Sequence, residues 1–214
     1  GTIDVAAADA VQDITAYDEI DSNYDITDNA ATLLSTTGVD TVVDSGVDTV
    51  FVTDSSVDAD TGAGLNALEL SLQDVGGTDI EFTVTDTAGA VASELSATGD
   101  ELDEANDVNV VGGTIDVAAA DAVQDITAYD EIDSNYDIED NAATLLSTTG
   151  VDAVVDSGVD TVFVTDSSVD ADTGVALNDL ELSLQDVGGT DIEFTVTDTA
   201  GAVASELSAT GDEL

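Results

Sequence analysis

The chain has 214 residues, of which 49 are Asp or Glu and none is Lys, Arg or His, so its formal net charge is −49. Cys, Met, Trp and Pro are also absent. This composition excludes the usual zinc, iron–sulfur and haem sites, the Ser-His-Asp, Cys-His and Schiff-base mechanisms, and nucleic-acid partners, because each of them needs residue types that the chain lacks.

The chain nevertheless contains enough apolar residues to form a core. Hydrophobic residues make up 43% of the sequence and the mean hydropathy is +0.13, unlike the composition of a disordered acidic tail. The apolar residues are mostly small or aliphatic, with only four Tyr and four Phe, which favours repeated small packing units. No run reaches the roughly 18 apolar residues of a membrane span, so we expect no membrane insertion.

A long internal repeat dominates the sequence. Residues 1–12 recur at 113–124, which gives a period of 112 residues, and the two copies differ at only five positions. We therefore predict two repeat modules, 1–102 and 113–214, joined by a connector at 103–112. Because the connector does not recur after Leu214, we interpret the chain as an excerpt from a longer tandem array.

Each copy contains a shorter strand–helix unit that recurs about four times, or once per 28 residues. Apolar residues at helical spacing predict a helix over 7–20, and Ala-rich residues predict another over 29–36. The segments 49–54 and 80–86 are β-branched or aromatic runs that end in Thr-Asp, as 24–28 also does, and we predict them as strands.

The aspartates that close these runs are predicted to be helix N-caps, namely Asp28, Asp54 and Asp86. Strand, cap and helix at this length predict an α/β repeat solenoid with parallel strands and short helices. One segment argues otherwise: Leu68, Leu70 and Leu72 alternate with polar residues before Gly76-Gly77, which is typical of a hairpin. Tandem antiparallel β-sandwich modules are therefore the alternative fold.

Two family resemblances bear on function. The segments NYDITDNAATLLS (23–35) and TVFVTDSS (49–56) resemble the acidic repeats of giant bacterial surface and matrix proteins exported by type I systems. This resemblance implies an extracellular or cell-surface location and a structural role. The segment EFTVTDTAGAVAS (81–93) resembles the terminal strand of immunoglobulin-like bacterial adhesin repeats, which implies the sandwich alternative.

The carboxylates pose an electrostatic problem because the chain has no basic side chain. If Asp28, Asp54 and Asp86 stacked on neighbouring parallel strands, they would lie about 4.8 Å apart and repel one another by roughly 3 kcal/mol per pair. Protonation of some carboxyls, high salt or Ca²⁺ would each reduce this repulsion. Calcium, which takes six to eight oxygen ligands, is the predicted counter-ion of a secreted protein. Asp58, Asp60 and Glu69 also occupy positions 1, 3 and 12 of an incomplete EF-hand loop.

We predict calcium ligands among these residues, the D-x-N-x-D run at 21–25, the connector, and the second-copy counterparts. For each cluster the alternative is a solvated acidic face that binds no specific ion. The candidate ligands are Asp21, Asn23, Asp25, Asp28, Asp54, Asp58, Asp60, Glu69, Asp86, Asp103, Asp107, Asp133, Asn135, Asp137, Asp140, Asp166, Asp170, Asp172, Glu181 and Asp198.

The sequence thus predicts a non-enzymatic structural segment of a large acidic extracellular protein. Its expected partners are copies of itself and divalent cations, with Ca²⁺ stabilising a stalk, fibre or surface layer. The alternative is a Ca²⁺-rigidified extender region of an adhesin built from immunoglobulin-like modules. Paired carboxylates could also hydrolyse glycosides, but nothing in the sequence favours one acidic pair over another.

Overall fold

The structure is a computed structural model, in which most of the chain is described. The described residues are 1–14, 24–43, 46–72, 78–98, 102–130, 134–156, 158–184 and 190–209. They divide into two compact units, and each unit includes a short segment from the other sequence copy. The first unit comprises 1–86, 93–109 and 126–128, and the second comprises 87–92, 110–125 and 129–214.

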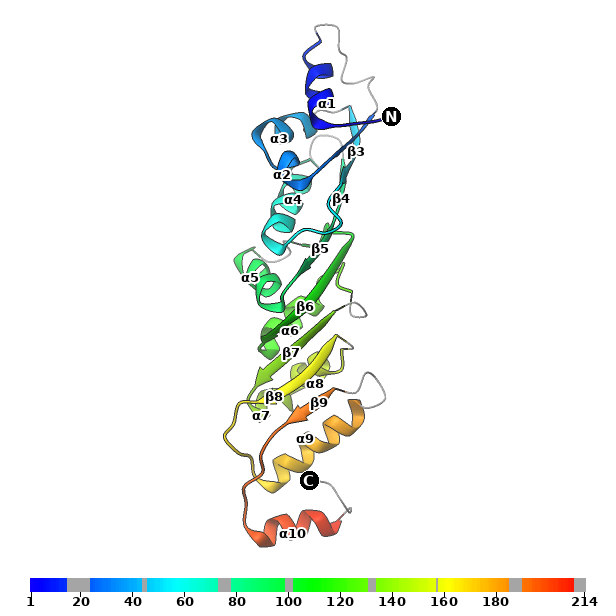
Figure 1. Ribbon diagram of the computed structural model, residues 1–214. Coiled ribbons are helices and arrows are strands. Elements are labelled where there is room, and N and C mark those ends of the chain that lie inside the picture. Colours follow the sequence, from blue (N-terminus) through cyan, green and yellow to red (C-terminus); the bar gives the residue numbers. More distant parts are fainter. Residues whose placement is uncertain are drawn as a thin grey trace. The chain divides into compact units, whose positions relative to one another are not determined.

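The strands form two sheets whose neighbouring strands run parallel (Figure 1). The first sheet contains, in order, β1 (Thr2–Ile3), β2 (Tyr24–Asp28), β3 (Val47–Val52) and β4 (Asp79–Glu81). The second sheet contains, in order, β5 (Thr83–Asp86), β6 (Asp107–Ile115), β7 (Asn135–Asp140), β8 (Val159–Val164) and β9 (Asp191–Glu193).

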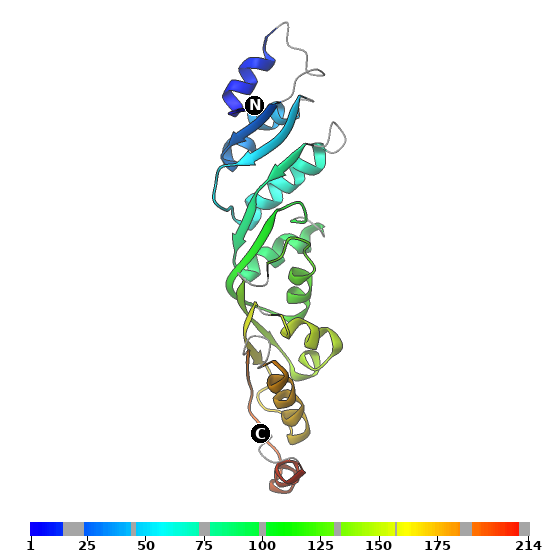
Figure 2. The same cartoon turned by 90° about the vertical axis from the view of Figure 1, so that its right-hand side faces the viewer.

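A helix or a pair of helices follows most strands, and in both units the helices lie on one side of the strands (Figure 2). The helices of the first copy are α1 (Val5–Gln12), α2 (Ala30–Leu33), α3 (Thr36–Val42), α4 (Ala59–Leu72) and α5 (Ala88–Thr98). Those of the second copy are α6 (Val117–Gln124), α7 (Ala142–Leu145), α8 (Thr148–Val154), α9 (Ala171–Leu184) and α10 (Ala200–Ala209).

The predicted α/β class with parallel strands is therefore confirmed, and the antiparallel sandwich is wrong for the described strands. The physical reason is that the Ala-rich segments after the strands are helical, and parallel neighbours need a crossover of this kind, whereas a sandwich built from hairpins does not. The predicted helix over 29–36 is interrupted, because α2 ends at Leu33 and Ser35 caps a separate helix, α3. The predicted helix over 7–20 begins earlier, at Val5, and its part beyond residue 14 lies outside the described residues.

The core lies between the strands and the helices. Ile26, Val50 and Ile80 face one another across β2, β3 and β4, and each is at most 2% exposed. The second copy repeats this row with Ile138 and Val162, both fully buried, and Ile192. Because these positions alternate with polar residues along each strand, the opposite face of each sheet carries threonines and acids.

The hairpin predicted around Leu68–Leu72 is wrong, because this segment is the end of α4. Leu65, Leu68 and Leu72 are buried at 0%, 6% and 1% exposure, whereas Leu70 is 48% exposed. Spacings of three and four residues place the three buried leucines on one helix face. The alternation of 68, 70 and 72 suggested a strand only because Leu65 was left out of the pattern.

Candidate functional site

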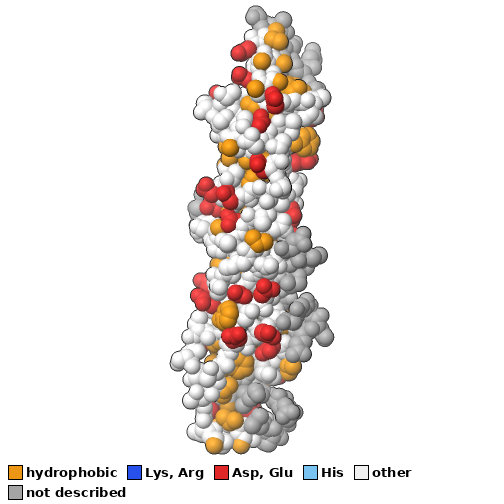
Figure 3. Space-filling view, in the orientation of Figure 1, with side chains coloured by type: hydrophobic (Ala, Val, Ile, Leu, Met, Phe, Trp, Pro, Cys, Tyr) orange, Lys and Arg blue, Asp and Glu red, His pale blue; other side chains and the backbone are white. Residues whose placement is uncertain are grey.

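Acidic side chains occur in small groups over the face seen in Figure 3, and no basic side chain accompanies them. The most regular arrangement lies where the strands end and the helices begin. There the helices begin at polar N-cap residues: Asp4 accepts a hydrogen bond from the Ala7 N–H (2.7 Å), and Asn29 accepts one from the Thr32 N–H (3.0 Å). Asp58 similarly accepts from the Thr61 N–H at 2.9 Å.

The predicted N-cap role of Asp28 is therefore wrong, because Asn29 takes that role. The N-cap prediction is also wrong for the other two aspartates, because neither directly precedes a helix. Asp54 lies five residues before the first residue of α4, and Asp86 is separated by Thr87 from the start of α5. These acids have another function. We call them, with their counterparts in the second copy, the strand-closing aspartates: Asp28, Asp54, Asp86, Asp140, Asp166 and Asp198.

Each strand-closing aspartate accepts a hydrogen bond from the first residue of a helix in the preceding strand–helix unit. In the first copy the Oδ2 atoms bond to the backbone nitrogens of Val5 (3.4 Å), Ala30 (2.8 Å) and Ala59 (3.0 Å). In the second copy the equivalent donors are Val117 (3.4 Å), Ala142 (2.7 Å) and Ala171 (3.1 Å). The same bond therefore links successive strand–helix units within each copy.

This hydrogen bond compensates part of the negative charge without a cation. The first N–H groups of a helix have no partner within the helix, and the helix dipole makes this end partially positive. A hydrogen bond to a charged acceptor contributes about 1.5–3 kcal/mol, more than one between neutral groups.

The register of the strands also keeps acids apart. On the face away from the helices, Thr114, Asp137, Thr161 and Asp191 form one row across the second sheet, so threonine alternates with aspartate. Phe163 similarly lies between Glu139 and Glu193, as Phe51 lies between Thr27 and Glu81 in the first copy.

No acid faces another acid in the register of β1 to β4 or of β6 to β9. The predicted stack of Asp28, Asp54 and Asp86 at the strand spacing is therefore wrong: Asp28 faces Val52. Like charges directly opposite one another destabilise a sheet, and this register avoids them.

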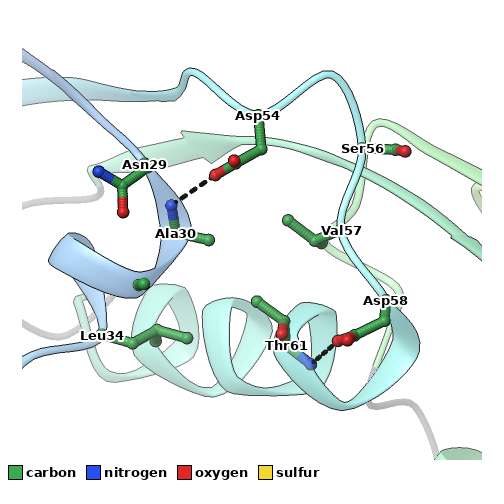
Figure 4. Close-up of a pocket in the computed structure, with 9 residues that line it drawn as sticks. Asn29, Ala30, Leu34, Asp54, Ser56, Val57, Asp58 and Thr61 are labelled. Atoms are coloured by element: carbon green, nitrogen blue, oxygen red, sulfur yellow. Dashed lines mark hydrogen bonds between the residues drawn. The ribbon is translucent and has the colours of Figure 1, made fainter.

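A pocket of about 360 Å³ lies beside two of these helix starts (Figure 4). Asp54 and Asp58 line it together with Asn29, Ser56 and the beginning of α2. An equivalent pocket of about 370 Å³ in the second copy is lined by Asp166 and Asp170. Hydrogen bonds from the Thr61 side chain and backbone lower the pKa of Asp58, so this carboxylate favours its ionised form and the pocket suits a cation or a neutral polar ligand.

The pocket thus brings together two of the four predicted ligands in this segment, Asp54 and Asp58. Asp60 is exposed in the first turn of α4, and Glu69 is buried further along the same helix. The predicted EF-hand-like loop is wrong, because residues 59–72 are helical and cannot wrap around an ion. The same holds for Asp172 and Glu181 in α9.

The remaining candidates are dispersed. Asp25 accepts from the Thr2 hydroxyl (3.4 Å), Asp103 from the Thr127 N–H (3.4 Å) and Asp107 from the Asn109 side-chain amide (3.0 Å). Asn135 accepts from the Gly112 N–H at 2.9 Å. Among the described residues, no three acidic side chains are grouped so that they could hold a metal ion. Asp21, Asn23 and Asp133 lie outside the described residues.

Glu69 is the acid with the most unusual environment. Its side chain is 6% exposed and accepts a hydrogen bond from the Ile80 N–H at 3.2 Å. Burial, together with repulsion from Glu104 and Asp79, raises its pKa to about 7. Glu69 was predicted to be a metal ligand, although its spacing from Leu65 and Leu72 already placed it on the buried face of the helix.

No protein-family model and no curated protein matches the chain. None of the helices in the described residues is long and apolar enough to cross a membrane. Function must therefore be argued from the geometry and from the internal repeat.

Replacing Glu69 should remove a pH dependence of stability. The folded protein keeps the Glu69 proton up to about pH 7, whereas the unfolded chain releases it near the ordinary value of 4.5. Stability should therefore be greatest below pH 4.5 and fall as the pH rises through 7. Relative to Glu69→Gln, the wild type should lose about 1–2 kcal/mol across this window, after allowance for solvent screening.

Urea denaturation at a series of pH values would measure this difference. Glu81→Gln, which removes an exposed carboxylate from β4, is the matched control and should keep the wild-type pH profile. Parallel profiles for wild type and Glu69→Gln would contradict the assignment.

Proposed function

We propose that the chain is a structural segment of a very large, acidic, extracellular or cell-surface tandem-repeat protein. In this proposal its strand–helix units stack as a continuous α/β solenoid, and the array forms a stalk, fibre or surface layer by self-association. The observation that supports it most is the hydrogen bond from each strand-closing aspartate to a helix start in the preceding unit.

That bond supports a repeat array because it relates each unit only to its neighbour. A solenoid is stabilised by such nearest-neighbour interfaces, so it can be lengthened by adding units without changing any existing contact. The near identity of the two copies means that an added copy would contain the same three bonds between its own strand–helix units. In this proposal the number of strand–helix units sets the length of the array, and no catalytic residue is required.

Calcium is the second part of the proposal. With a net charge of −49, copies of the chain repel one another unless ions screen or bridge them. The Asp54–Asp58 pocket and its counterpart at Asp166–Asp170 offer two carboxylates each, so water would have to complete the coordination shell. We propose weak sites of the kind found in extracellular modules, with dissociation constants of about 10⁻⁴–10⁻³ M.

The dimensions of longer arrays test the structural proposal. Proteins with one, two and four copies of the 112-residue period should show a radius of gyration that grows in proportion to copy number, measured by small-angle X-ray scattering. A compact globule would instead grow with roughly the 0.38 power of length and an unfolded chain with about the 0.6 power. Either of these exponents would contradict the solenoid.

Calcium should raise the melting temperature at low salt, and EDTA should remove that increase. The double variant Asp58→Asn, Asp170→Asn keeps the N-caps but removes a carboxylate from each pocket, so it should lose most of the calcium effect. The control is Asp48→Asn, Asp160→Asn, which neutralises two exposed strand acids and should keep the effect. An equal calcium response in both double variants would exclude the pocket sites.

A further inference from the structure

Residues 102–109, which we call the docking segment, pack closely against the first copy. Leu102 and Val108 are fully buried and Ala105 is 7% exposed, although the segment also carries Asp103, Glu104 and Asp107. All of these residues belong to the first compact unit. The part of the predicted connector from 103 to 109 therefore packs against the first copy.

Specific contacts fix the docking segment in place. The Glu104 N–H donates to Asn66 Oδ1 (2.9 Å), and the Asn106 N–H donates to the Phe82 carbonyl (2.9 Å). A Cβ at Gly62 would lie 2.6 Å from Val84 Cγ2 and 3.2 Å from Leu102 Cδ2, so the glycine allows both β5 and the docking segment to pack closely against α4. Repulsion from Glu104 contributes to the raised pKa of Glu69, which places the segment beside that carboxylate.

The surface that receives this segment in the first copy consists of Gly62, Asn66, Glu69 and Phe82, and we call it the receptor surface. None of the five differences between the copies falls on it. The second copy therefore has the same four residue types at the equivalent positions: Gly174, Asn178, Glu181 and Phe194.

The two receptor surfaces differ in exposure. Asn66, Glu69 and Phe82 are 2%, 6% and 4% exposed, whereas Asn178, Glu181 and Phe194 are all partly exposed. The difference continues into the next helix. Ala88 and Val91 of α5 are fully buried, whereas their counterparts in α10 are exposed (Ala200) and partly exposed (Val203). Asn178 receives no backbone hydrogen bond from a described residue comparable to the one that Asn66 receives.

We infer that the receptor surface of the second copy is a docking site for a segment with the sequence of residues 103–109, supplied by an adjoining repeat copy. The segment begins at 103 because the chain already contains the counterpart of Leu102, which is Leu214. The inference rests on the proposed array and identifies what joins its modules. The occupant follows from the internal comparison: in the first copy this sequence donates hydrogen bonds to the Asn66 side chain and to the Phe82 carbonyl, and both residues recur as Asn178 and Phe194. Docking would bury apolar side chains and satisfy backbone groups, so charge attraction is not needed.

Docking should depend on ionic strength, because the docking segment and the receptor surface both carry negative charge. Glu104 of the docking segment lies close enough to Glu69 to repel it, so docking would place an equivalent glutamate beside Glu181, and no basic residue offsets the two charges. Salt screens repulsion between exposed charges, so docking should strengthen as the salt concentration rises.

The test is to extend the full chain after Leu214 with the sequence of residues 103–128. Hydrogen exchange of the α9 amides should slow about tenfold or more relative to the unextended chain, and more at high salt. The matched control is the same extension carrying Ala105→Asp and Val108→Asp in the appended sequence, which should give no protection.

A receptor variant provides a second measurement. Because alanine itself favours a helix, the unextended Asn178→Ala chain is the reference for this variant, and the extension should give it little of the protection that it gives the wild type. Equal exchange with the intact and the control extension would overturn the docking site. Linear growth of the radius of gyration without this protection would support the array and reject the docking site. Protection without linear growth would support the docking site and reject the array.

Discussion

The carboxylate of a strand-closing aspartate, bonded to the first N–H of a helix in the preceding unit, is the contact that connects the rest of the structure. It occurs three times in each copy, at 2.7–3.4 Å, and it satisfies two needs at once. A helix start has unpaired N–H groups and a partial positive charge, and a chain without cations has carboxylates that need such a partner. Because donor and acceptor belong to successive units, satisfying them also joins the units together.

Strand register is the second means by which the fold accommodates a charge of −49. Aspartates alternate with threonines across the open face, and Phe163 separates two glutamates, so opposite positions on neighbouring strands from β6 to β9 do not pair two acids. Glu69 shows what happens where acids are not kept apart. It is buried near Glu104 and Asp79, and burial together with their repulsion raises its pKa to about 7. The proposed calcium sites would add stability to this arrangement, but the helix starts and the register already compensate or separate many of the charges.

Periodicity predicted the α/β class and the parallel strands, since β-branched runs followed by Ala-rich stretches form these elements locally. It could not assign partners across units. Asp28 looked like an N-cap because only its own neighbours were considered, whereas its partner Val5 lies 23 residues away in the preceding unit. The EF-hand interpretation of Asp58, Asp60 and Glu69 failed because ligand spacing was matched without testing the helical spacing of Leu65, Leu68 and Leu72. The connector was predicted from its position between the two repeat copies, and the packing of Leu102, Ala105 and Val108 was not visible in the sequence.

The most direct test of this account compares two acids that lie close together in the chain, Asp54 and Asp48. Both substitutions to Ala remove one negative charge from a highly acidic chain, but only Asp54 bonds to a helix start, while Asp48 is exposed on β3. Measured by chemical denaturation at low salt, Asp54→Ala should destabilise the protein by about 1.5–3 kcal/mol. Asp48→Ala should be neutral or slightly stabilising, because it only relieves repulsion. If Asp54→Ala proved as stable as Asp48→Ala, the bond between strand-closing aspartates and helix starts would not be what holds successive units together.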